Sequence, residues 1–161
     1  MKKLVSILTL VSSFAFADSD VLARYEFAAG EGRDIQIYNS SLTNQGELLV
    51  AIFQKGGTPP RAVQKYQLSR QVALTLIAKA KLLATAELNE VNNAIICMMM
   101  PPPSMSVNEL YVSQGSDSLR LVDGPHGCWV SHKVQPKSDF HHLTAHELKA
   151  ELRVLALELS K

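Results

Sequence analysis

The sequence predicts an α+β domain, in which a mainly antiparallel sheet of about six to seven strands carries two helices on one face. Three observations favour this fold class. Segments of alternating apolar and polar residues lie on both sides of a long stretch with helical periodicity, a second helical pattern closes the chain, and turn residues separate the extended segments. The length of 161 residues suits a single domain.

Extended segments dominate the first half of the chain. Residues 21–27 alternate between apolar and polar side chains, and residues 35–38 repeat that pattern after a glycine-containing turn, so the two segments predict a hairpin. Residues 48–53 are apolar at every position, which predicts a strand covered on both faces. A Gly-Pro turn then precedes a short extended stretch over residues 62–68.

The second half of the chain also contains extended segments. An apolar run over residues 94–100 ends at three prolines, and strands are predicted over residues 107–112, 118–122 and 128–134. The loop between the last two contains an Asp-Gly-Pro sequence, which is typical of turns.

The first helix is predicted over about residues 69–88. Ser69 is a good N-cap, and the residues that follow have high helix propensity without glycine or proline. Their apolar side chains gather on one side at 100° per residue, as in an amphipathic core helix. The exit from this helix is marked by Asn89, Asn92 and Asn93.

The second helix is predicted over residues 144–160. Thr144 and Glu147 form a T-x-x-E capping box, which satisfies backbone donors at a helix start. Residues 139–143 are therefore expected to form a loop, and both helices are expected to pack on the same face of the sheet.

A secretory signal peptide is predicted over residues 1–17. Two lysines precede an apolar run, and a small-x-small cleavage site ends at Ala17, so the mature domain spans residues 18–161. The apolar run is shorter than the ~20 residues that a membrane-spanning helix needs. Asp18 stands where a lipoprotein would have cysteine. The expected protein is periplasmic or secreted and is not inserted in a membrane.

The charge balance excludes an obvious nucleic-acid-binding surface. Removing Lys2 and Lys3 from the 16 Lys and Arg leaves 14, against 15 Asp and Glu, a net charge of −1. Phosphate binding needs several cations gathered on one face, and this chain has no such cluster.

Cys97 and Cys128 are the only cysteines of the chain. In an oxidising compartment a single pair is most simply a disulfide. Closing this loop would stabilise the folded state by ~3.5 kcal/mol on the chain-entropy model. Metal-ligating or redox thiols are the alternative.

The closing helical pattern contains two apolar stripes. One docks the helix on the domain and comprises Leu148, Leu152, Leu155 and Leu159. The second lies well round the helix, and its residues are the predicted contact with a protein partner or a second copy of the chain: Ala150, Val154 and Leu157. The alternative is that both stripes are buried within the domain itself.

All five histidines lie in the final third of the chain, and His142 and His146 stand four residues apart at the predicted helix start. Such a pair can hold Zn²⁺ or Cu²⁺ if a third ligand is brought to it. Candidates for that ligand are Asp139, Glu147 and His132. The alternative interpretation is an ordinary surface pair without a bound cofactor.

The sequence contains none of the common catalytic motifs. It lacks a G-x-S-x-G elbow, an H-E-x-x-H pair and glycine-rich phosphate loops. We therefore expect an exported, non-enzymatic binding protein that contacts another protein through its C-terminal helix. The alternatives are a periplasmic Zn²⁺- or Cu²⁺-binding protein and, with catalytic residues assembled from distant positions, a small secreted hydrolase.

Overall fold

The computed structural model describes residues 20–30, 35–54, 60–94, 108–114, 117–122, 125–126 and 130–161. These residues form two helices, α1 (Arg70–Leu83) and α2 (Asp139–Leu159), and nine strands. The strands are β1 (Val21–Ala29), β2 (Gln36–Thr43), β3 (Glu47–Gln54), β4 (Ala62–Gln67), β5 (Leu88–Ala94), β6 (Asn108–Gln114), β7 (Asp117–Val122), β8 (Pro125–His126) and β9 (Val130–Pro136).

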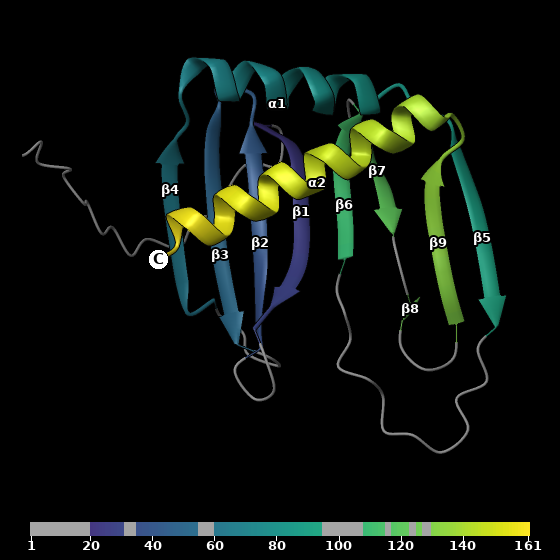
Figure 1. The fold of residues 1–161 in the computed structure, drawn as a ribbon, viewed down its shortest axis with the longest axis horizontal. Helices are drawn as coiled ribbons and strands as arrows, with labels where there is room; N and C mark the ends of the chain where they lie inside the picture. Colours follow the sequence, from purple (N-terminus) through teal and green to yellow (C-terminus); the bar gives the residue numbers. More distant parts are fainter. Residues whose placement is uncertain are drawn as a thin grey trace, which may run out of the picture.

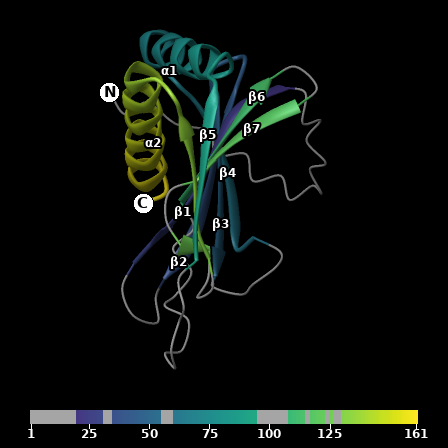
Figure 2. The ribbon, with the colours of Figure 1, turned by 90° about the vertical axis from the view of Figure 1, so that its right-hand side faces the viewer.

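One antiparallel sheet contains all of these strands. Its order is β4-β3-β2-β1-β6-β7-β9-β5, and the short β8 pairs with β9 beside this path. Helix α2 crosses one face of the sheet diagonally, and α1 runs along one end of the strands (Figure 1). The view along the sheet shows α2 standing in front of one face and α1 above it (Figure 2). The predicted α+β class with an antiparallel sheet and two helices is confirmed.

The predicted number of six to seven strands is wrong, because the described residues form eight strands in the main path plus β8. The unexpected strand is β5, whose sequence is mostly polar and was taken as the exit from a helix. It lies at the edge of the sheet and pairs with β9 from Leu88, opposite Pro136, to Ala94, opposite Val130. An edge strand is held by its backbone ladder on one side, so it does not need the alternating apolar pattern of a core strand.

The core lies between the sheet and the helices. In the central strand β1, Ala23, Tyr25 and Phe27 are buried on the helix side. The Phe27 ring stacks on the Tyr25 ring at 5.1 Å and on the Tyr38 ring at 5.2 Å, measured between centroids. These aromatic contacts join β1 to β2 directly beneath the helices.

Helix α1 begins as predicted and ends earlier. The Ser69 hydroxyl accepts a hydrogen bond from the Val72 backbone N–H at 3.4 Å, which is the expected N-cap. The helix ends at Leu83, not Leu88, and the Thr85 hydroxyl donates to the Leu82 carbonyl at 2.8 Å. The pairing of Leu88 with β9 takes this segment out of the helix, so tertiary contacts override helix propensity.

Helix α1 lies close to the turn between β2 and β3 because that turn contains Gly46. This glycine has a φ of +77°, a conformation that other residues rarely adopt. A Cβ atom at this position would lie 2.6 Å from the Cβ of Ala73 in α1. The absence of a side chain at Gly46 and the small one at Ala73 set the distance between helix and sheet.

The predicted start of the second helix at Thr144 is wrong, since α2 begins at Asp139. The N-cap is Ser138, whose hydroxyl accepts from the His141 backbone N–H at 3.2 Å. The Thr144 hydroxyl instead donates to the Phe140 carbonyl at 2.9 Å, within the helix. Residues 139–143 are therefore helical rather than a loop, and this first turn adds Phe140 and Leu143 to α2.

Two predictions fall on residues outside the described ranges: the signal peptide over residues 1–17 and the disulfide between Cys97 and Cys128. They stay predictions. Within the part of the chain that the structure describes, neither helix has the length and apolar character required to cross a membrane.

Candidate functional site

The inner side of α2 holds the helix on the sheet. Leu148 and Leu152 of the predicted docking stripe are fully buried, as is Ala156. Buried Ser40 of β2 lies beneath the helix, and its hydroxyl donates a 3.5 Å hydrogen bond to the Leu152 carbonyl. The docking of α2 therefore combines apolar packing with a polar contact to the middle of the sheet.

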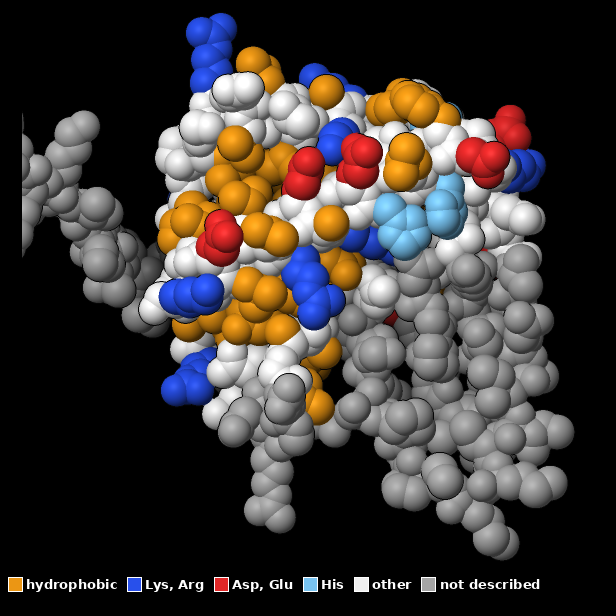
Figure 3. Space-filling model, viewed as in Figure 1, with side chains coloured by type: hydrophobic (Ala, Val, Ile, Leu, Met, Phe, Trp, Pro, Cys, Tyr) orange, Lys and Arg blue, Asp and Glu red, His pale blue; other side chains and the backbone are white. Residues whose placement is uncertain are grey.

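The second predicted stripe of α2 lies largely outside the core. Val154 has 52% of its surface exposed, Ala150 is exposed, and Leu157 is half-buried. The alternative that both stripes are buried within the domain is wrong for Val154 and Ala150. Hydrophobic side chains gather along α2 and beside it on this face of the molecule (Figure 3).

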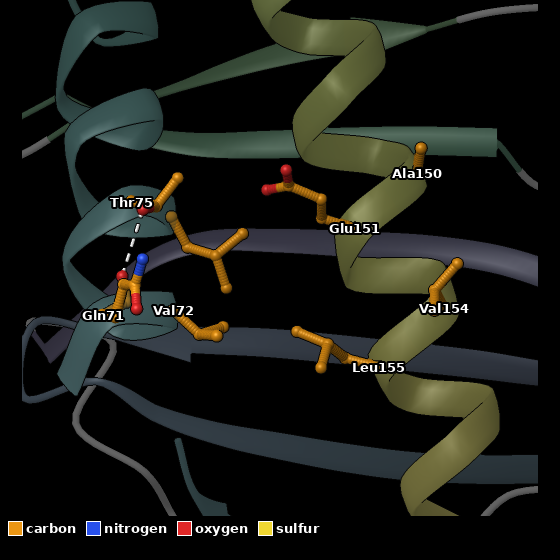
Figure 4. A pocket seen from close by; sticks show the side chains of 8 residues that line it. Gln71, Val72, Thr75, Ala150, Glu151, Val154 and Leu155 are labelled. Carbon is orange, nitrogen blue, oxygen red and sulfur yellow. Dashed lines mark hydrogen bonds between the residues drawn. The ribbon is translucent and has the colours of Figure 1, made fainter. Parts of the chain in front are cut away.

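An apolar groove of about 470 Å³ separates α1 from α2. Leu155 of α2 points toward Val72 of α1, whereas Val154 and Ala150 lie on the side of α2 that is turned away from α1, at the margin of the groove (Figure 4). The complete lining comprises Gln71, Val72, Thr75, Leu76, Ala150, Glu151, Val154 and Leu155. The groove thus contains two of the three residues predicted to contact a partner.

One end of the groove is closed by charges. Lys79 of α1 forms ion pairs with Glu147 at 2.8 Å and with Glu151 at 2.9 Å. Burial lowers the pKa of Lys79, but hydrogen bonds to the two carboxylates and their charges outweigh this effect, so the pKa is raised. The two like-charged glutamates of α2 therefore share a cation that α1 supplies.

The contribution of α1 to the groove was not predicted from the sequence. The helical periodicity of the sequence places Val72 on the apolar side of α1, yet it is 38% exposed because it lies at the groove. Val72 stands four residues before the buried Leu76, a spacing that is compatible both with burial in the core and with exposure at the groove. Only the separation of the two helices in space distinguishes them.

The structure brings His142 and His146 together, with ring centroids 4.8 Å apart. Among the described residues no group of three His, Cys, Asp or Glu side chains is placed to hold a metal ion. Glu147 is instead paired with Lys79. The two histidines also share a small hollow with buried Lys149. The remaining candidate, His132, lies in β9, and its side chain is outside what the structure describes.

A charged network that was not predicted from the sequence lies on the other face of the sheet. Arg120 of β7 donates to both carboxylate oxygens of buried Glu109 in β6, at 2.8 and 2.9 Å. The Tyr111 hydroxyl also donates to Glu109, and the Arg24 guanidinium lies 4.5 Å from the centre of the Tyr111 ring. The only sign of this network in the sequence is the alternation of polar residues in the three strands β1, β6 and β7, whose pairing does not follow from the sequence.

The fifth member of this network is Glu26, which pairs across the strands with Glu109. Burial raises the pKa of the Glu26 carboxyl, the charge of Glu109 raises it further, and Arg24 and Arg120 oppose both effects. Both oxygens of Glu109 are occupied by Arg120, and one also accepts from Tyr111. The network is therefore best explained as a link between β1, β6 and β7 rather than as an acid–base pair.

No protein-family model matches this chain, and no curated protein or solved structure is significantly similar to it.

Proposed function

We propose that this chain is a small exported binding protein without catalytic activity, which holds another polypeptide against α2 and the groove between α1 and α2. One observation supports this most directly. Val154 is 52% exposed on a helix whose opposite side is buried in the domain, and it lies where the groove and the outer side of α2 meet. A branched apolar side chain in that position is typical of a contact surface.

The chemistry of the groove favours an apolar segment of a protein. Val72, Leu76 and Leu155 supply its walls, while Gln71 and Thr75 line it from α1 with polar atoms. The Thr75 hydroxyl already donates to the Gln71 carbonyl at 3.0 Å, so it is satisfied within its own helix (Figure 4). A helix that lays its apolar face into a groove is a common mode of peptide recognition.

The same proposal includes export and a single disulfide. The lysines and apolar run of residues 1–17 support cleavage after Ala17, and oxidation would then join Cys97 to Cys128. Intact mass and thiol titration of the protein from its natural compartment measure both features. An uncleaved amino terminus or two free thiols would contradict this part of the proposal.

The binding function can be tested with a pair of matched variants. Val154→Asp places a charge at the groove, whereas Leu74→Asp places the same charge on the outer side of α1, where the leucine is 57% exposed. Both positions are exposed, so we expect the free energy of unfolding of each variant to lie within about 0.5 kcal/mol of that of the unaltered protein. In affinity capture from the native extracellular fraction, the Leu74→Asp protein should retain the same bound protein as the unaltered chain, and Val154→Asp should lose it.

Two results would contradict the proposal. Equal capture by Val154→Asp and the unaltered protein would show that α2 is not the contact. Capture abolished by a chelator would favour the metal alternative instead.

The metal alternative has one specific observation in its favour, the 4.8 Å separation of the His142 and His146 rings. Zn²⁺ or Cu²⁺ bound only to the folded state would raise the melting temperature by mass action. The His146→Ala variant should lose that shift. No change in melting temperature with saturating metal would remove this alternative.

A further inference from the structure

The outer side of α2 has a spacing that suits pairing with another helix. Its residues recur at alternating intervals of three and four, the repeat of a coiled-coil seam. We call this set the α2 seam, and it comprises Phe140, Leu143, Glu147, Ala150, Val154 and Leu157. At 100° per residue the seam lies opposite the buried side of the helix, which contains Ala145, Leu148, Leu152 and Ala156.

The seam exposes a large apolar surface at both ends of the helix. Phe140 is 63% exposed and Leu143 is 58% exposed, and Val154 is 52% exposed near the other end. The first two belong to the helical turn that Ser138 caps. With them, the seam extends over 18 of the 21 residues of α2, or about 27 Å.

We propose that the partner of α2 is a second copy of this chain, and that the two α2 helices pack antiparallel along their seams. This inference rests on the proposed function, because it names the partner of the same surface. An antiparallel arrangement about a point between Glu147 and Ala150 matches the seam with itself. Each layer then pairs two complementary residues: Phe140 with Leu157, Leu143 with Val154, and Glu147 with Ala150 of the second copy.

The intervals of three and four along the seam read the same in both directions, so the seam can be paired with its own reverse. In an interface with two-fold symmetry both copies use the same surface. If one residue of the first copy contacts a second residue of the other copy, the reverse contact is also made. The outermost layers join a ring to a leucine, the next join two branched side chains, and the central layers join a carboxylate to the smallest side chain of the seam. A partner of unrelated sequence would not require such a match between the two ends of α2.

The charge of Glu147 selects the antiparallel orientation. In a parallel pair the same position of each helix would meet, so Glu147 would face Glu147 of the second copy. In the antiparallel pair it faces Ala150, while Lys79 of its own chain neutralises it at 2.8 Å. A parallel pair would gain contacts between Arg153 and Glu158 of the second copy, but exposed ion pairs contribute little.

The arrangement of the domain leaves the seam accessible to a second copy. In Figure 2, α2 lies to the left of the sheet, which is seen on edge, so the side of the helix that is turned away from the strands is the outer one. The hydrophobic side chains along α2 in Figure 3 belong to this same face. Isologous packing would bury Phe140 and Leu143 of one copy at the Val154 end of the other.

The proposal can be tested by restoring a broken layer. Leu143→Lys and Val154→Asp each place a charge opposite an apolar residue in both copies, so each variant alone should sediment as a monomer where the unaltered protein is a dimer. An equimolar mixture should dimerise again, because one layer then joins the new lysine to the new aspartate and its symmetry mate is unaltered. Leu74→Asp, on the outer side of α1, should leave the dimer intact.

The outcomes separate this inference from the proposed function. An unaltered protein that sediments as a monomer at all accessible concentrations overturns the inference, and α2-dependent capture of a different protein would then leave the function standing. A dimer that Val154→Asp does not weaken overturns it as well. A dimer that the single variants break and the mixture does not restore excludes the antiparallel register. Single variants that unfold cooperatively and keep the circular dichroism spectrum of the unaltered protein show that assembly, not folding, is measured, since loss of the partner by itself lowers the melting temperature.

Discussion

The face of the sheet beneath the helices is apolar, whereas the centre of the opposite face carries paired charges. Both faces are visible in one strand, since Leu110 and Val112 of β6 are buried toward the helices and Glu109 and Tyr111 point the other way. The first pair is stabilised by removal of apolar surface from water. The second is stabilised by hydrogen bonds to Arg120. Substitutions on the two faces should therefore differ in size and in their dependence on pH.

The largest effect is expected beneath α2. Leu152 is fully buried between the helix and the sheet, so Leu152→Ala leaves a cavity that the surrounding core can only partly fill. We expect the free energy of unfolding in urea to fall by about 2–5 kcal/mol. Leu74→Ala, at an exposed position of α1, is the control and should change it by less than about 0.5 kcal/mol. Similar losses in both variants would mean that the buried side of α2 is not the core.

An intermediate effect is expected on the charged face. Arg120→Met leaves the buried Glu109 carboxylate without its main donor and beside Glu26, so we expect a loss of about 2 kcal/mol in urea unfolding. Glu109→Gln keeps the shape of the side chain and leaves only a half-exposed Arg120 to be solvated, so its cost should be smaller, about 1 kcal/mol. A larger loss of unfolding free energy in Glu109→Gln than in Arg120→Met would show that the arginine, rather than the buried carboxylate, is the group that is costly to leave without its partner.

The smallest effect concerns the pH dependence of stability at Glu26. Burial and the charge of Glu109 raise the pKa of its carboxyl in the folded protein, so ionisation of this group costs stability above that pKa. The cost disappears as the pH falls below the ordinary value of 4.5. Glu26→Gln should therefore be more stable than the unaltered protein at neutral pH, and the difference in melting temperature should shrink toward pH 4.5.

Glu158→Gln, at an exposed position of α2, is the control for that measurement. A Glu26→Gln protein that is less stable at neutral pH than at acidic pH, relative to the unaltered chain, would contradict the assignment of burial as the dominant cause.

The strands with alternating or continuous apolar residues were predictable because burial imposes that pattern on them. Residues 48–50 in β3, for example, are all buried, although the strand lies second from the edge of the sheet. The polar strand β5 was not predictable, because its place depends on a backbone ladder with β9. The same pairing decides where α2 begins: β9 ends at Pro136, and the Lys137 N–H donates to the Glu87 carbonyl at 2.8 Å. Ser138 and Thr144 are both good N-caps by sequence, and only this contact distinguishes them.

The candidate site was predictable on α2 and not beyond it. Ala150 and Val154 stand out in the sequence because they form a second apolar stripe on one helix. The wall supplied by Val72 depends on the distance between two helices far apart in the chain. Phe140 and Leu143 joined the surface only when the start of the helix was known.

The strand order has a consequence for how the molecule is completed. The chain starts in the middle of the sheet, builds outward from β1 to the edge at β4, crosses with α1 to the opposite edge at β5, and returns to the middle at β6. The pairing of Ala23 with Val112 therefore joins two strands that are far apart in the sequence, and closes a loop over residues 23–112. Before this closure, one side of β1 presents open backbone N–H and C=O groups to which strands of other molecules can add. The first half of the protein is thus protected from aggregation by its second half.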